Sequence, residues 1–142
     1  MRVMLDTNII LSGLFFEGNE RKLLDAIFHN EFTGVVSETT LRECASVIGR
    51  KFSRHPKEKD ARRLLSLLEK SMETIEDAVA ESQLQFAKTA IRHANDAPIL
   101  AAALASKPDY FITGDPDFFH LTKSIPLKIV TAAQFLKNMD QT

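Results

Sequence analysis

Short apolar segments alternate with segments of helical periodicity along the chain, and this alternation restricts the fold more than any other feature. The apolar segments have no polar face, which is typical of strands that are buried on both sides. Strands that are separated by helices form a parallel sheet covered by helices on both faces. An α/β fold is therefore predicted. The expected strands are residues 3–5, 33–36, 72–75, 110–113 and 127–130, and the expected helices lie around 23–28, at 38–48, at 60–69, around 84–91, from Asp96 onward and from Thr131 through Leu136.

Length and composition fit one ordinary domain that spans residues 1–142, because 44% of the residues are hydrophobic and 26% are charged. The longest apolar run, Ala97 to Ala105, is much shorter than the roughly 20 residues that span a membrane. Asp6 interrupts the N-terminus before the apolar region of a signal peptide could form. The single cysteine, Cys44, cannot form an internal disulfide. We expect a cytoplasmic protein without a membrane partner.

Acidic residues stand where the predicted strands end. Asp6 directly follows the first strand, and Asp115 and Asp117 follow the strand that ends at Thr113. Asp96 begins the apolar helix that precedes this strand. Ligands of open parallel sheets bind outside the carboxyl ends of the strands. These side chains are therefore expected to project into one crevice.

Each acid also has a structural interpretation when it is taken alone. Asp6 and Asp96 stand where an aspartate often caps a helix, and Asp115 with Asp117 is typical of a turn. Glu43 lies off the apolar stripe of its helix, so its side chain could face either the crevice or water. The coincidence of several acids favours a functional interpretation.

Carboxylates that converge without lysine or arginine between them repel one another, and a hard divalent cation such as Mg²⁺ or Mn²⁺ neutralises that repulsion. Metal-bound water is a nucleophile near neutral pH, and metal ions stabilise both oxygens in phosphodiester hydrolysis. Small polar residues beside the acids could hold the ligands or metal-bound waters, or could cap helices. They are Thr7, Asn8, Ser37 and Thr113.

The acids in this order resemble the PIN-domain ribonucleases, in particular the VapC-type toxins of toxin–antitoxin pairs. The matching segments cover essentially the whole chain from residue 1 to about 138. They are Leu5-Asp6-Thr7-Asn8-Ile9, Ser37 through Glu43, Asp96-Ala97-Pro98-Ile99-Leu100 and Thr113-Gly114-Asp115-Pro116-Asp117-Phe118.

The resemblance implies a Rossmann-like PIN domain with a central parallel sheet of four or five strands, and a divalent-metal-dependent endoribonuclease of single-stranded RNA. It implies that Asp6, Glu43, Asp96 and Asp115 are catalytic metal ligands, with Asp117 as an additional or alternate metal-binding acid. Many members carry one more acid just before the position of Asp96, where this chain has His93-Ala94-Asn95. Toxins of this type are commonly homodimers that an antitoxin silences.

The net charge of −1, from 18 basic and 19 acidic residues, hides a basic segment from Arg50 to Arg63. This segment has seven basic and two acidic residues. Phosphate backbones bind such patches, although a solvated helix face has the same composition. The candidate RNA contacts are Arg50, Lys51, Arg54, Arg62 and Arg63.

Other sites are less well supported by the sequence. The glycines form neither a dinucleotide fingerprint nor a phosphate-binding loop. The histidines lack metal-ligand spacing, so ordinary surface or core positions are expected for His29, His55, His93 and His120. The rival to a nuclease is a PIN-like module that binds RNA or protein and has weak or no catalytic activity.

Overall fold

A computed structural model describes residues 1–140 of the chain. Strands and helices alternate as expected. The strands are β1 (Arg2–Leu5), β2 (Thr33–Ser37), β3 (Glu73–Ile75), β4 (Tyr110–Ile112) and β5 (Ile129–Val130). The helices are α1 (Thr7–Phe15), α2 (Asn19–Phe28), α3 (Glu38–Lys51), α4 (Glu58–Ser71), α5 (Asp77–Ala90), the 3-10 turn η1 (Ala94–Asp96), α6 (Ala97–Ser106), α7 (Pro116–Phe119) and α8 (Ala132–Asp140).

The five strands form one parallel sheet in the order β3-β2-β1-β4-β5. The central strand β1 pairs Met4 with Val35 of β2 on one side and with Phe111 of β4 on the other. This is the doubly wound strand order, in which the winding direction reverses between β1 and β4. The predicted parallel α/β sheet is confirmed, and its reversal point is where such folds bind ligands.

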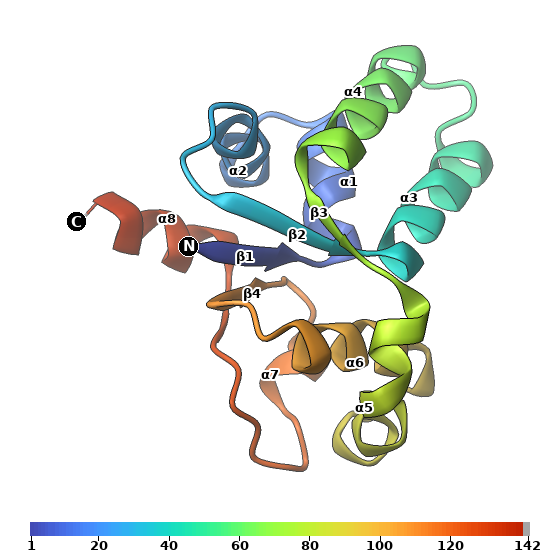
Figure 1. The fold of residues 1–142 in the computed structure, drawn as a ribbon. Helices are drawn as coiled ribbons and strands as arrows, with labels where there is room; N and C mark the ends of the chain where they lie inside the picture. Colours follow the sequence, from blue (N-terminus) through green and yellow to red (C-terminus); the bar gives the residue numbers. More distant parts are fainter. Residues whose placement is uncertain (141–142) are drawn as a thin grey trace.

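Helices cover both faces of the sheet, as the apolar residues of its central strands β1, β2 and β4 require. In Figure 1, α1 to α4 lie on one side of β1 and β2, whereas α5, α6 and α7 lie on the other side. The same division separates two hydrophobic clusters, one that includes Leu5 and Val36 and one that includes Met4 and Val35. Alternate residues of one strand therefore pack into opposite layers.

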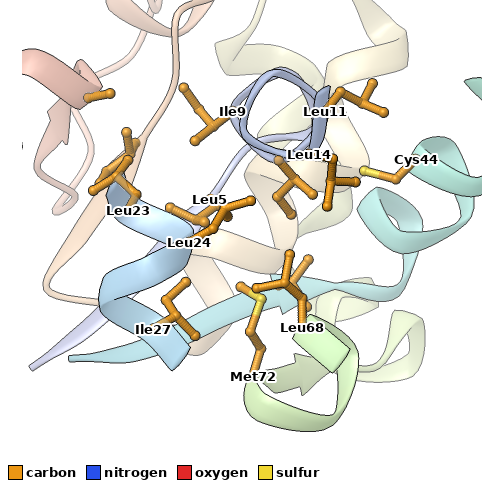
Figure 2. Close-up of a cluster of buried hydrophobic side chains, with 14 of the residues drawn as sticks. Leu5, Ile9, Leu11, Leu14, Leu23, Leu24, Ile27, Cys44, Leu68 and Met72 are labelled. Carbon is orange, nitrogen blue, oxygen red and sulfur yellow. The ribbon is translucent and has the colours of Figure 1, made fainter. Parts of the chain in front are cut away.

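Interlocking leucine side chains fill the layer beneath α1 to α4. Figure 2 shows Leu24 of α2 beside Leu5 of β1, with Leu68 and Met72 approaching from the end of α4. Leu5, Leu24 and Leu68 are each at most 1% exposed. Full burial of one such side chain contributes about 1.5–3 kcal/mol to the free energy of folding. This packing therefore holds α1 and α3 in place on the sheet, and these helices carry polar groups at the sheet edge.

The apolar helix α6 is buried on most sides, as its sequence predicts. It has ten residues and packs chiefly against α5, with Leu100 and Ala103 fully buried. A left-handed residue, Lys107, ends it. No helix among residues 1–140 combines the length and the apolar character needed to cross a membrane.

Two local predictions need correction. The last strand is limited to Ile129–Val130, because only these residues pair with β4, and it does not start at Leu127. The residues after β4 are not only a turn, since Pro116–Phe119 form the short helix α7. Asp115 caps this helix and proline stands at its first position, where the missing N–H costs no hydrogen bond.

Candidate active site

Asp6 is fixed at the carboxyl end of the central strand. It directly follows β1, and its backbone N–H donates to Ile112 O of β4 at 3.0 Å. Its Oδ1 accepts from the N–H of Thr7 at 2.8 Å, so the side chain caps α1. Asp6 is only 4% exposed. The helix-cap interpretation of Asp6 is thus confirmed, while its carboxylate also faces the other acids described below.

The hydroxyl of Thr113 links Asp6 to Asp115. Thr113 Oγ1 donates to Asp6 Oδ2 at 2.6 Å and accepts from the N–H of Asp115 at 3.0 Å. Burial raises the pKa of Asp6, the bonds from Thr113 and Thr7 oppose the rise, and repulsion from Asp115 and Glu43 adds to it. The pKa of Asp6 therefore depends on the charges of Asp115 and Glu43, which are far away in the sequence.

Glu43 faces the crevice, which decides between the two orientations that the sequence left open. Thr7 Oγ1 donates to Glu43 Oε2 at 2.6 Å, across 36 residues of sequence. The contact joins the start of α1 to the middle of α3. Glu43 is nevertheless an exposed residue overall, so its carboxylate lies at the open side of the site.

Three aspartates form the tightest cluster of acids. Asp96, Asp115 and Asp117 each place one carboxylate oxygen so that the three oxygens lie within 4.8 Å of one another. Asp115 Oδ1 also accepts from the N–H of Asp117 at 2.9 Å. The cluster brings the residue before α6 together with the first turn of α7, and its spacing suits a bound cation.

The crowding of negative charge is visible at Asp96. Partial burial raises its pKa to about 6, with repulsion from Asp115, Asp6 and Asp117 as further causes and nearby His93 acting in the opposite direction. The ionisation of Asp96 is therefore coupled to the charge of Asp6 as well as to the charges of Asp115 and Asp117.

A pocket of about 170 Å³ lies at this edge of the sheet and contains most of the predicted site. Among its lining residues, Lys51 is the one cation. Lys51 follows Glu43 and Val47 at four-residue intervals on the same face of α3, which places a positive charge beside the carboxylates. The lining residues are Asp6, Thr7, Asn8, Leu11, Glu43, Val47, Lys51, Asp96, Ile99 and Asp115.

Ser37 acts on the site only through other residues. Its Oγ caps α3 by accepting from the N–H of Thr40 at 3.0 Å, and it contacts Thr40 Oγ1 at 3.0 Å. Thr40 is fully buried and lies 3.5 Å from Thr7 Oγ1. Sequence reasoning missed Thr40, although a threonine three residues after a capping serine is a recognisable signal.

His93 lies at the surface, one of the two positions expected for it, but its side chain also contacts an acid of the site. Its Nε2 is 3.2 Å from Asp117 Oδ2. A search for metal-ligand spacing in the sequence does not detect this contact, because its partner Asp117 comes from a different segment of the chain.

The basic segment runs from the end of α3 to the start of α4. Only Lys51 of the five candidate RNA contacts lines the acidic pocket. Arg62 pairs with Glu58 at 3.1 Å and Arg50 bonds Ser46 at 3.2 Å, so part of the basic charge is engaged locally. Arg54 and Arg63 are exposed.

The donor set fits a divalent cation. Its oxygens are carboxylates, the ligands that Mg²⁺ and Mn²⁺ prefer. Within residues 1–140, no lysine or arginine forms an ion pair with any of the five acids. In the described part of the chain, no salt bridge from lysine or arginine therefore neutralises this carboxylate charge.

These acids lie within a recognisable family pattern, because residues 2–117 match a family model described as PIN domain. The chain belongs to the PIN domain family. The match includes Asp6, Glu43, Asp96 and Asp115, and the strand order described above is the fold of this PIN domain. A comparison with curated proteins gives no match.

Several solved structures share the fold of this PIN domain. VapBC2 from Rickettsia felis, bound to a DNA fragment from its promoter, is similar with a TM-score of 0.63 and 21% identity, covering 92% of this chain and 98% of that one. A toxin–antitoxin complex from Klebsiella pneumoniae has a TM-score of 0.59 and 22% identity, covering 92% and 97%. FitAcB from Neisseria gonorrhoeae has a TM-score of 0.62 and 17% identity, covering 92% and 98%.

Proposed function

We propose that this PIN domain is a divalent-metal-dependent endoribonuclease that hydrolyses phosphodiester bonds of single-stranded RNA. One observation carries the proposal, namely the convergence of five carboxylates at the reversal point of the sheet with no lysine or arginine paired to them. Membership of the PIN family supports a nuclease.

Asp96, Asp115 and Asp117 would hold a Mg²⁺ or Mn²⁺ ion, and Asp6 and Glu43 would add two further carboxylates in the same pocket. Such an ion, when bound, activates water for attack and neutralises charge that develops on the phosphate. The protein itself holds the acids of the site in fixed positions. Asp6 is fixed by Thr113, so little reorganisation of this carboxylate is required.

Lys51 would hold a phosphate of the RNA strand beside the acidic pocket, because its ammonium forms no ion pair within the described chain. Arg54 and Arg63 extend positive charge away from the pocket, toward α4. Arg50 and Arg62 would contribute less, since local bonds hold them. Backbone phosphates give such binding a strong dependence on salt.

The biological role that we propose is the toxin of a toxin–antitoxin pair acting in the cytoplasm. Support comes from the folds named above, which include toxin–antitoxin complexes. An antitoxin that covers the acidic pocket would block the proposed RNA site. A homodimer belongs to the same proposal.

Cleavage of end-labelled single-stranded RNA with Mn²⁺ tests the proposed activity. Asp115→Asn is a suitable variant, because asparagine Oδ1 can still cap α7 while the negative charge is removed. We expect loss of cleavage by at least about 100-fold, as for removal of a group that stabilises the transition state. EDTA should abolish cleavage by the wild type.

Glu31→Gln is the matched control, since this exposed acid lies before β2 at the opposite end of the strands. It should cleave as the wild type does. Equal cleavage by Asp115→Asn would show that the activity comes from a contaminant. RNA binding without cleavage would instead support the rival binding module.

A further inference from the structure

His93 contacts the aspartate cluster from outside. It lies between α5 and η1, in the segment that leads to Asp96, whereas its partner Asp117 lies in the first turn of α7. His93 Nε2 is 3.2 Å from Asp117 Oδ2, and the two side chains are 60% and 22% exposed. The pair therefore connects the two segments that supply the three clustered aspartates.

The contact completes a pattern among the acids of the site. Three other carboxylates accept hydrogen bonds from their neighbours: Asp6 from Thr113 and from the N–H of Thr7, Glu43 from Thr7, and Asp115 from the N–H of Asp117. Among the described residues, His93 is the side chain that pairs with the carboxylate of Asp117. Outer partners of this kind orient ligating carboxylates and are needed for full metal affinity.

His93 is placed beside the cluster rather than in it. The group of carboxylate oxygens that lie within 4.8 Å of one another comprises only the three aspartates, so His93 contacts Asp117 without belonging to that group. A proton on Nε2 can point at Asp117 Oδ2 in the neutral ring as well as in the cation. The orientation of Asp117 therefore does not depend on a charged histidine.

We infer that His93 is a positioning residue that holds Asp117 Oδ2, so that the carboxylate of Asp117 stays directed at the oxygens of Asp96 and Asp115 and the cluster binds a divalent cation more tightly. The inference deepens the proposed function, on whose metal site it rests.

Calorimetric titration of the metal-free full chain with Mn²⁺ tests the inference. We expect His93→Ala to weaken Mn²⁺ binding about tenfold, near the lower end for such outer partners because the pair is partly exposed. His93→Gln, whose amide can donate to Asp117, should recover most of the affinity. Arg92→Ala is the matched control, since this exposed neighbour forms no ion pair with any of the five acids, and the variant should bind Mn²⁺ as the wild type does.

A double-mutant cycle with Asp117→Ala separates positioning from a direct role. If His93 acts through Asp117, His93→Ala has no further effect on Mn²⁺ affinity in the Asp117→Ala background. An equal further loss there, or an equal loss in Arg92→Ala, would overturn the inference.

The remaining outcomes distinguish this inference from the proposed function. Wild-type Mn²⁺ affinity in His93→Ala would overturn the positioning role and leave the metal-dependent nuclease standing. A wild type that binds no Mn²⁺ would overturn both. Thermal unfolding of the metal-free variants checks folding, and the exposed position of His93 predicts melting temperatures equal to that of the wild type within about 2 °C.

Discussion

Thr113 Oγ1 lies 2.6 Å from Asp6 Oδ2 and joins the carboxyl ends of neighbouring strands β1 and β4. The same oxygen accepts from the N–H of Asp115. One buried hydroxyl thus sets the positions of two acids that are 109 residues apart. This contact makes Thr113 a sensitive place to test the site.

Thr113→Val removes both bonds while preserving the shape of the side chain. A buried carboxylate oxygen then loses its donor, so we expect the free energy of unfolding to fall by about 1–3 kcal/mol. The pKa of Asp6 should rise further, because the Thr113 bond opposes the effect of burial. Urea denaturation measures the first effect, and Thr113→Ser should restore most of the stability.

Two glycines inside helices should respond in opposite ways to the same substitution. In α1, a Cβ at Gly13 would lie 2.6 Å from Leu24 Cδ1 and 3.0 Å from Glu20 O, so Gly13→Ala should destabilise the protein by about 1–3 kcal/mol. In α3, a Cβ at Gly49 would meet only Arg62 Nη2 at 3.7 Å. Gly49→Ala should therefore stabilise by up to about 1 kcal/mol. Equal effects in denaturation would contradict this packing.

Mn²⁺ should stabilise the folded protein by mass action. At a concentration of about one hundred times Kd, binding adds about 2.7 kcal/mol. For a chain of this size that corresponds to a rise in melting temperature of roughly 6–10 °C. Scanning calorimetry with Mn²⁺ or EDTA measures the rise, which should be largely absent in Asp115→Asn and unaffected in Glu31→Gln.

The raised pKa of Asp96 predicts how stability changes with pH in the metal-free protein. Its pKa is about 6 when folded, against about 3.9 for an unperturbed aspartate. Between these values the folded protein binds more protons than the unfolded chain, so the free energy of unfolding decreases as pH rises. Denaturation from pH 4 to pH 8 should show this decrease, and Asp96→Asn should make it shallower. An unchanged slope would disprove the assignment.

Lys51 and Arg62 should contribute unequally to RNA binding. Lys51 lines the acidic pocket, whereas Arg62 is paired with Glu58. A plot of log affinity against log salt concentration has a negative slope, and Lys51→Ala should make it shallower by about 0.7 for one lost phosphate contact on single-stranded RNA. Arg62→Ala should change it less. Fluorescence anisotropy of a labelled RNA between 50 and 200 mM salt, as a working range, provides the comparison.

Local sequence pattern was sufficient to predict the five strands and the α/β class. Val3, Met4 and Leu5 are three consecutive apolar residues, so both faces of the strand they form are apolar and have to be buried. Asp6 and Asp115 stand directly after strands, and parallel strands bring such residues to one edge. Their convergence was therefore predictable before any contact was known, and the structure brings them close enough to repel each other.

Tertiary packing alone decided the remaining features. The direction of Glu43 depends on Thr7, and the position of His93 depends on Asp117, because each contact joins segments whose spacing follows from how the helices cross the sheet. Strand order likewise depends on which connections reverse direction, and local periodicity carries no signal for this. The sequence by itself determined that Asp6 and Asp115 reach the sheet edge. The structure decided which hydroxyl, amide and imidazole groups hold them there, since these partners are chosen by distance in space.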